Sequence, residues 1–196
     1  MFTVNEYYYY KKLFSDKFCD YVIERGLSQS KIQAKVGGNL KVGGNLEGKY
    51  DKKVRQSDIV WITDKDILHP VMDVIQRANK NANWNFELDL NLGVKAQFTI
   101  YKKNQFYDWH VDCYQSDINR KLSFSLNLSG PSDYTGGEFL FKFPWKSKRN
   151  NIYEMKEINE KGSCVIFPSY QLHKVKPVKK GVRYSLVVWL CGRNWR

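Results

Sequence analysis

A histidine and an aspartate lie two residues apart in the stretch FYDWHVDCYQ, residues 106–115, where they could bind one metal ion together. Side chains at positions i and i+2 of a β-strand point to the same face, so His110 and Asp112 could reach a common ion. An imidazole and a carboxylate suit a borderline metal such as Fe(II) and leave coordination positions open. A His-X-Asp pattern alone also arises by chance as an ordinary polar pair. A metal site therefore requires a third ligand.

The chain has three histidines, so only two others could complete the site. His173 follows the apolar stretch SCVIFPSYQL, and the end of that strand could face His110 in one sheet. His69 precedes Pro70 at the start of an expected helix, which favours a structural or surface role. Arg183 opens the stretch RYSLVVWL, where its guanidinium could bind a carboxylate as a fork. The order His-X-Asp, His, Arg matches a facial triad of non-haem iron oxygenases with a carboxylate-binding arginine.

Strands are expected to position these residues, because apolar and polar residues alternate from about residue 86 onward. The expected strands are LDLNLG (88–93), AQFTIY (96–101), KLSFSLNLS (121–129), GEFLFKF (137–143), SCVIFP (163–168) and RYSLVVWL (183–190), after an earlier one at DIVWIT (58–63). Short strands between glycine, proline and asparagine turns predict a sandwich or jelly roll. The polar residues of KLSFSLNLS, Ser123, Ser125 and Asn127, could form either a solvated face or the lining of a pocket.

Helices are expected before the strands. Residues 13–27 read as an amphipathic helix with Ser15 as N-cap and Gly26 as C-terminal stop. Its apolar stripe would comprise Phe18, Tyr21, Val22 and Leu27. Residues 66–84 read as a second helix, with Asp66 as N-cap and Pro70 in its first turn. We therefore expect a single domain over residues 1–196, with helical support and a loop in 1–85 and a jelly-roll core in 86–196.

A tandem hexapeptide, KVGGNLKVGGNL, occupies residues 35–46. Two copies are too few for a solenoid, and Gly-Gly-Asn is a turn signal, which predicts a mobile loop or a loose hairpin. Farther along, PWKSKRNN at 144–151 reads as a basic loop.

The composition of 196 residues, 42% hydrophobic and 15% aromatic, is that of a globular chain rich in β-structure. A net charge of +12 favours an acidic partner such as nucleic acid, although dispersed lysines could equally be a solvated surface. No apolar run reaches the roughly 20 residues that span a membrane. With no apolar signal segment in MFTVNEYYYYKK, we expect a cytoplasmic protein whose four cysteines are free thiols. Cys113 and Cys164 would be small core residues rather than ligands.

From about Ala96 to Cys191 the sequence resembles the Fe(II)- and 2-oxoglutarate-dependent dioxygenases, in particular the prolyl 4-hydroxylase-like branch with its PKHD-type hydroxylases. The resemblance is carried, in the family's order and spacing, by YKKNQFYDWHVD, LSFSLNLSGPSDYTGGEFLF and KGSCVIFPSYQLHKVKPVKKGVRYSLVVWL. It implies a double-stranded β-helix, or jelly roll, with N-terminal helices packed outside. It also implies that His110, Asp112 and His173 bind Fe(II) and that Arg183 binds the distal carboxylate of 2-oxoglutarate.

The resemblance places further residues near the co-substrate. Tyr101 stands near the family tyrosine that contacts it, Tyr107 matches a second tyrosine near the metal, and Trp189 matches an aromatic wall. Tyr101 could equally be an ordinary strand aromatic, and Trp189 a core residue. Some relatives carry a tyrosine where this chain has Ser125, which leaves a shorter hydroxyl beside Arg183.

The activity implied is hydroxylation of a substrate by O₂, coupled to decarboxylation of 2-oxoglutarate to succinate, with ascorbate dependence as a family habit. The branch suggests a proline-containing peptide or protein as substrate, and the 35–46 repeat is a candidate lid over it. Three alternatives remain: a nucleic-acid oxygenase of the same superfamily, a non-catalytic β-sandwich binding module, and a zinc or cupin-type enzyme without 2-oxoglutarate. Neither the substrate's identity nor the oligomeric state follows from the sequence.

Overall fold

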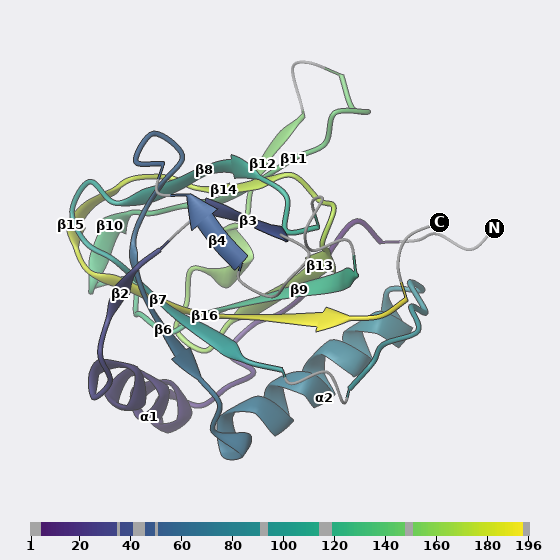
Figure 1. The fold of residues 1–196 in the computed structure, drawn as a ribbon, viewed down its shortest axis with the longest axis horizontal. Helices are drawn as coiled ribbons and strands as arrows, with labels where there is room; N and C mark the ends of the chain where they lie inside the picture. The colour runs from purple at the N-terminus through teal and green to yellow at the C-terminus, as the bar shows by residue number, and fades with distance from the viewer. Residues whose placement is uncertain are drawn as a thin grey trace.

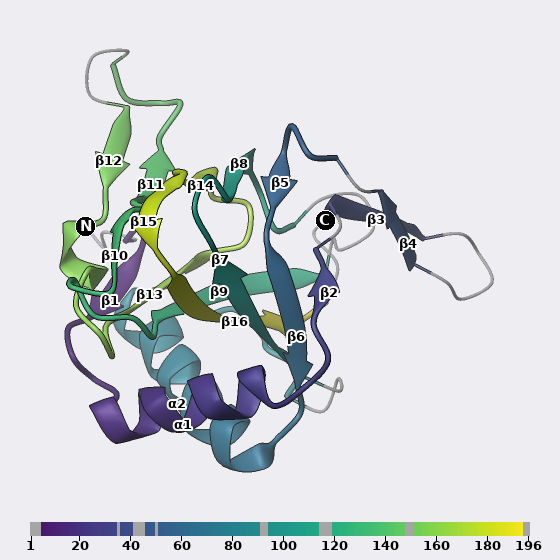
Figure 2. The same ribbon diagram turned by 90° about the vertical axis from the view of Figure 1, so that its left-hand side faces the viewer.

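A computed structural model describes residues 5–34, 36–40, 46–49, 51–90, 94–113, 119–147 and 151–193. Two helices cover one face of a seven-stranded sheet, and a five-stranded sheet faces its other side (Figures 1 and 2). In chain order the elements are β1 (Tyr8–Tyr10), α1 (Asp16–Leu27), β2 (Ile32–Gln33), β3 (Val36–Leu40), β4 (Leu46–Lys49), β5 (Arg55–Gln56), β6 (Asp58–Ile62), α2 (Lys65–Asn81), β7 (Ala96–Tyr101), β8 (Phe106–His110), β9 (Arg120–Asn127), β10 (Tyr134–Gly136), β11 (Phe139–Lys142), β12 (Ile152–Glu154), β13 (Cys164–Pro168), β14 (His173–Val175), β15 (Val178–Gly181) and β16 (Arg183–Cys191). The predicted double-stranded β-helix with helices outside is confirmed.

The larger sheet has the order β1-β13-β9-β16-β7-β6-β2, with every neighbouring pair antiparallel. The alternation in β9 decides what each face of this sheet touches. Leu122, Phe124 and Leu126 pack in the core beneath α1 and α2. Ser123, Ser125 and Asn127 are buried on the opposite face, toward the second sheet. The polar half of the alternation therefore does not form a solvated surface.

The smaller sheet has the order β12-β11-β14-β8-β5. Phenylalanines from β11 and β13 fill one part of the space between the two sheets. Phe141 packs edge-on against Phe167, with ring centres 5.0 Å apart. This buried aromatic cluster occupies one part of the inter-sheet space, and the cavity described below occupies another.

Ser15 is the N-cap of α1 as predicted, since its side chain accepts a hydrogen bond from the Phe18 amide, and the helix therefore starts at Asp16 rather than at residue 13. We predicted that Gly26 ends the helix, but Gly26 lies inside α1 and is buried. A β-carbon at Gly26 would lie 2.3 Å from the Phe98 ring, so the glycine allows α1 to approach β7 closely. The predicted apolar stripe is wrong in part: Tyr21 and Leu27 are about 40% exposed, at 39% and 41%.

Helix α2 starts at Lys65, one residue before the predicted range of 66–84, and Asp64 rather than Asp66 is its N-cap. The Asp66 carboxylate instead accepts a hydrogen bond from the Tyr21 hydroxyl, which ties α2 to α1. Pro70 lies in the second turn instead of the first. The helix ends at Asn81 rather than Trp84, because Asn83 takes a left-handed conformation with φ 60°.

The division at residue 85 is not a division between helices and sheets. Strand β1 pairs with β13, β5 pairs with β8, and β6 pairs with β7, so N-terminal segments complete both sheets. Conversely, the strand predicted at 88–93 is absent from the described part of that segment. Residues 88–90 contribute a single bridge between Asp89 and Cys191, and residues 91–93 lie outside the described range.

The first copy of the repeat forms β3, which pairs antiparallel with β4, and Leu40 pairs with Leu46, the last residue of the repeat and the first of β4. This agrees with the loose-hairpin prediction, although residues 35 and 41–45 of the repeat lie outside the described residues. Within the basic stretch 144–151, residues 144–147 and 151 form no helix or strand, and the rest lies outside the described part.

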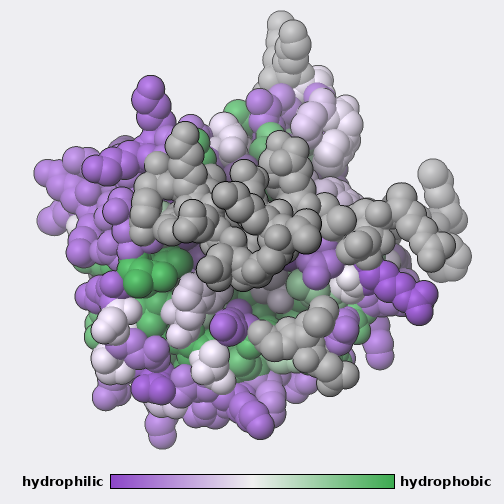
Figure 3. All heavy atoms as spheres, in the orientation of Figure 1, coloured by the Kyte–Doolittle hydropathy of each residue, from purple (hydrophilic) through white to green (hydrophobic). Residues whose placement is uncertain are grey.

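Cys19 and Cys164 are buried free thiols, as predicted. Burial raises the pKa of Cys19 to about 11 and that of Cys164 to about 12, as expected for thiols enclosed in the core. Neither described helix is long and apolar enough to cross a membrane. Hydrophilic side chains cover most of the rim of the face in Figure 3, in keeping with the net charge of +12.

Candidate metal centre

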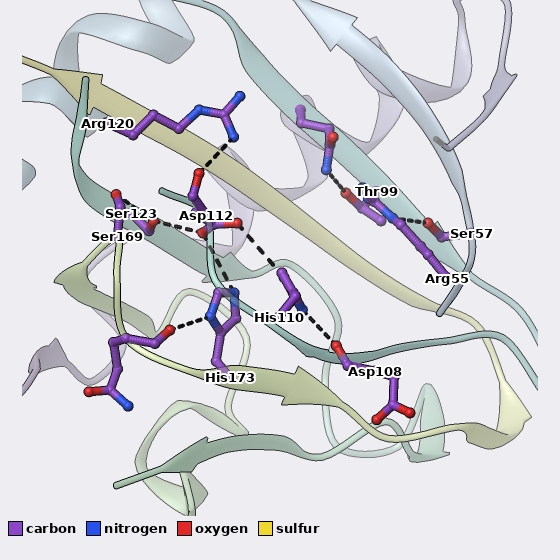
Figure 4. Close-up of polar contacts among 12 residues, drawn as sticks. Arg55, Ser57, Thr99, Asp108, His110, Asp112, Arg120, Ser123, Ser169 and His173 are labelled. Carbon is purple, nitrogen blue, oxygen red and sulfur yellow. Dashed lines mark hydrogen bonds and ion pairs between the residues drawn. The ribbon is translucent and has the colours of Figure 1, made fainter. Parts of the chain in front are cut away.

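His110 and His173 meet because two strands of the smaller sheet place them opposite each other. His110 ends β8, His173 begins β14, and the two are direct partners in the antiparallel pair. Asp112 follows β8 by two residues, and its amide donates to the Ser169 carbonyl ahead of β14. One ligand atom from each of the three residues lies within 4.8 Å of the others. The three predicted metal ligands therefore converge (Figure 4).

Backbone carbonyls set the orientation of both imidazoles. Nδ1 of His110 lies 2.7 Å from the Asp108 carbonyl oxygen, and Nδ1 of His173 lies 2.9 Å from that of Gln171. A carbonyl only accepts, so each Nδ1 carries the proton and each Nε2 keeps a free lone pair. These Nε2 atoms lie 3.8 Å and 3.5 Å from the Asp112 carboxylate oxygens. Two imidazole lone pairs and a carboxylate oxygen thus face one point.

Two serines hold the Asp112 carboxylate. The Ser123 hydroxyl donates to Asp112 Oδ2 at 2.7 Å, so the hydroxyl of Ser169, 3.0 Å away, must donate to Ser123. Although burial opposes ionisation, electrostatic interactions with the neighbouring His173, His110 and Arg120 lower the pKa of Asp112 to about 2. Burial, reinforced by His173, keeps the pKa of His110 well below its ordinary 6.5. Around neutral pH the site therefore offers an anionic oxygen and a neutral His110 nitrogen to a cation.

The donor set fits Fe(II). Two imidazole nitrogens and one carboxylate form the facial arrangement that leaves positions open on non-haem iron. The same donors also bind Zn(II), so the triad alone does not exclude the zinc alternative.

Arg183 distinguishes the two alternatives. It begins β16 opposite Tyr101 on β7, with its guanidinium carbon 5.6 Å from the Tyr101 ring centre. The side chain is only 2% exposed, yet its Nε and Nη1 have no hydrogen-bond partner. Among the described residues no carboxylate lies within ion-pair distance of it. A buried guanidinium with idle donors is costly unless an anion binds there, which fits a carboxylate ligand.

All eight residues predicted for the site line one cavity: Tyr101, Tyr107, His110, Asp112, Ser125, His173, Arg183 and Trp189. The Tyr107 ring stacks on His110 with centres 3.4 Å apart, and burial raises the pKa of its hydroxyl to about 12. Trp189 contacts the Arg120 guanidinium, whose carbon lies 4.3 Å from its ring centre, and its Nε1 is buried without a partner. The structure thus brings these residues together, while their roles toward a co-substrate stay predictions.

Other lining residues escaped prediction. Phe139 and Phe167 wall the cavity beside His173, and Arg55 lines it from β5. Ser123, which we expected on one face of β9 with Ser125, either solvated or lining a pocket, is buried and hydrogen-bonds Asp112. Nothing in the local sequence of Arg55 marks it, since its place depends on the pairing of β5 with β8. His69 is exposed on α2, as predicted, and is not part of the triad.

Comparison with protein families matches residues 96–191 to the 2OG-Fe(II) oxygenase superfamily. A PKHD-type hydroxylase of Pseudomonas aeruginosa is 28% identical over 134 residues, covering 62% of this chain and 56% of the relative. One from Synechococcus is 39% identical over 85 residues, covering 43% of this chain and 35% of the relative. The chain thus spans a little more than half the length of the first relative and about a third of the second.

Solved structures with the same fold include a Pseudomonas putida prolyl-4-hydroxylase, with a TM-score of 0.70 and 19% identity, covering 96% of this chain and 94% of that one. A Trichoplax adhaerens prolyl hydroxylase, in complex with a hypoxia inducible factor peptide fragment, has a TM-score of 0.71 and 16% identity, covering 95% of this chain and 84% of that one. At these identities the likeness concerns the fold.

Proposed function

We propose that the chain hydroxylates a peptidyl proline while converting 2-oxoglutarate to succinate, since residues 96–191 match the 2OG-Fe(II) oxygenase superfamily and the chain is similar to PKHD-type hydroxylases. The observation that carries the proposal is the pairing, in one cavity, of a His-Asp-His triad with a buried arginine whose donors are idle. A zinc or cupin-type enzyme that needs no 2-oxoglutarate would leave Arg183 without a role.

Each group of residues has a part in the reaction. His110, Asp112 and His173 would hold Fe(II), and Arg183 would bind the distal carboxylate of 2-oxoglutarate. With O₂, these two bound groups supply the oxidation, in which one oxygen atom enters the substrate C–H bond and the other enters succinate, with loss of CO₂. Tyr101, Tyr107, Ser125 and Trp189 would line the co-substrate, while Phe139, Phe167 and Val175 keep water from it.

A peptide substrate is supported by the names of similar proteins. The Pseudomonas putida protein is a prolyl-4-hydroxylase, and the Trichoplax adhaerens protein was solved with a peptide fragment. Dependence on ascorbate belongs to the same proposal and rests on the family habit alone.

The deciding experiment measures succinate from 2-oxoglutarate with Fe(II) and O₂, with and without proline-containing peptides. We expect turnover that peptides stimulate and that His110→Ala abolishes. A folded, iron-loaded protein that forms no succinate above background would overturn the assignment.

Arg183→Ala tests the co-substrate role. We expect a rise in the KM for 2-oxoglutarate of about 100-fold, because a charge-assisted contact is lost, with iron binding retained. Iron content and KM are measured on the same preparation. Simultaneous loss of iron would show instead that Arg183 supports the structure of the triad.

The net charge of +12 favours one second candidate, a nucleic-acid oxygenase of the same superfamily. That candidate predicts salt-sensitive DNA binding together with 2-oxoglutarate turnover that proline peptides do not stimulate. A non-catalytic binding module predicts no stoichiometric iron and no effect of His110→Ala.

A further inference from the structure

A second arginine lines the cavity, and neither the triad nor the carboxylate site at Arg183 accounts for it. Arg55 lies on β5, opposite Tyr107 of β8, and is only 6% exposed. Figure 4 shows its side chain running toward Ser57 and Thr99, on the far side of His110 from Asp112. Arginine is seldom buried this deeply without a charged partner.

The contacts of Arg55 fix its guanidinium close to the triad. Its Nε donates to the Ser57 hydroxyl at 2.9 Å. Its guanidinium carbon lies 4.4 Å from the Tyr107 ring centre, and that ring lies 3.4 Å from the His110 ring, so the cation is within about 8 Å of a metal ligand. The Ser57 contact occupies Nε and leaves the two terminal nitrogens as a fork.

The charges around the cavity do not balance without a further anion. Among the described residues no carboxylate lies within ion-pair distance of Arg55 or Arg183, and the only acidic residue in the lining, Asp112, faces the two histidines. If the proposed function holds, a divalent metal and doubly negative 2-oxoglutarate bind together and cancel each other. One positive charge is then left in the cavity, and burying an uncompensated cation is costly.

We propose that Arg55 binds a carboxylate of the substrate in the same cavity as the carbon that is oxidised. This rests on the proposed function and narrows its substrate class: for a proline substrate, the carboxylate is that of a C-terminal or free proline rather than of an internal residue. A planar fork of two N–H donors matches a carboxylate in geometry and charge. Stacking on Tyr107 holds the fork beside the triad, where an internal peptide bond would leave the cation unpaired.

The test is a binding measurement that does not need turnover. Mn(II)-loaded protein, saturated with 2-oxoglutarate without oxygen, is titrated calorimetrically with N-acetyl-L-proline and with N-acetyl-L-prolinamide. These probes share the pyrrolidine ring and differ in charge. We expect the wild type to bind the acid at least about tenfold more tightly than the amide, as for a hydrogen bond to a charged group.

Three variants sharpen the result. Arg55→Gln removes the charge and should abolish the preference while leaving 2-oxoglutarate affinity unchanged. Arg55→Lys keeps the charge without the fork, packs in similar space and should retain a reduced preference. Lys65→Gln, an exposed lysine at the start of α2, removes the same charge from the surface and should leave the preference intact.

Several outcomes would overturn the proposal. They are no preference in the wild type, binding of neither probe, a preference that persists in Arg55→Gln, or weakened 2-oxoglutarate binding in that variant, which would assign Arg55 to the co-substrate. If Arg55→Gln does not fold, a full wild-type preference in Arg55→Lys would count against the fork. Failure of the proposed function appears separately, as absence of succinate in the turnover assay.

Discussion

At the scale of single residues, the metal site depends on groups that do not touch the metal. The Ser123 hydroxyl donates a hydrogen bond to Asp112 Oδ2 at 2.7 Å. Two backbone carbonyls each accept from Nδ1 of one histidine and so determine the tautomer of both rings. Such contacts fix the ligand before the ion arrives, so that metal binding does not have to order the side chains.

Ser123→Ala should therefore weaken metal binding by about 10-fold to 100-fold, because the carboxylate loses the hydrogen bond that orients it. Titration with Fe(II) or Mn(II) measures the change. Ser125→Ala is the matched control: it removes a hydroxyl from the same face of the same strand, while the hydrogen bond to Asp112 comes from Ser123, and it should leave metal affinity unchanged. Equal losses in both variants would mean that β9, and not the hydrogen bond, carries the effect.

At the scale of elements, the two sheets contribute different residues to the cavity. The smaller sheet carries the triad on β8 and β14, while the larger sheet carries Arg183 and Trp189 on β16. Helices α1 and α2 pack against the outer face of the larger sheet, opposite the face that lines the cavity.

Gly26→Ala should show how closely α1 must approach that sheet. The new methyl group would meet the buried Phe98 ring, and we expect a net loss of about 1–2 kcal/mol in the free energy of unfolding, because overpacking exceeds the gain in helix propensity. Urea denaturation measures the loss. Lys17→Ala, at an exposed position of the same helix, should change stability by less than about 0.5 kcal/mol, and an equal loss there would contradict the packing argument.

The β3–β4 hairpin remains a predicted lid, since part of the repeat lies outside the described residues. Deleting one hexapeptide should raise the KM for a peptide substrate severalfold and lower kcat, because a shortened hairpin closes less well over the substrate. Unchanged constants would show that the hairpin does not act as a lid. The KM for 2-oxoglutarate serves as the internal reference.

At the scale of the whole molecule, a metal that binds only the native state must stabilise the entire fold. At 100 times the dissociation constant the gain is about 2.7 kcal/mol, which raises the Tm of a chain this size by roughly 5–10 °C. We expect this rise with Mn(II) relative to EDTA in thermal unfolding. It should vanish in His110→Ala and persist in His69→Ala, whose imidazole is exposed on α2; a full rise in His110→Ala would place the metal elsewhere.

Local patterns in the sequence were sufficient to predict features that depend only on neighbouring residues. The period-two alternation of β9 predicts a strand because neighbouring side chains must point to opposite faces, and Ser15 predicts a helix start because its hydroxyl can reach an amide three residues on. The family resemblance added roles for the triad and Arg183, and it narrowed a sandwich or jelly roll to a double-stranded β-helix.

Tertiary structure alone decided which face of each strand became the cavity and which distant segments completed it. Gly26 lies inside α1, where a β-carbon would collide with the Phe98 ring, 72 positions away. The prediction that Gly26 stops the helix was therefore wrong. Arg55 enters the site only because β5 pairs with β8, across about 50 residues of chain. Pairing between strands is set by burial and hydrogen bonding of segments far apart in the sequence, and no local pattern around Arg55 records it.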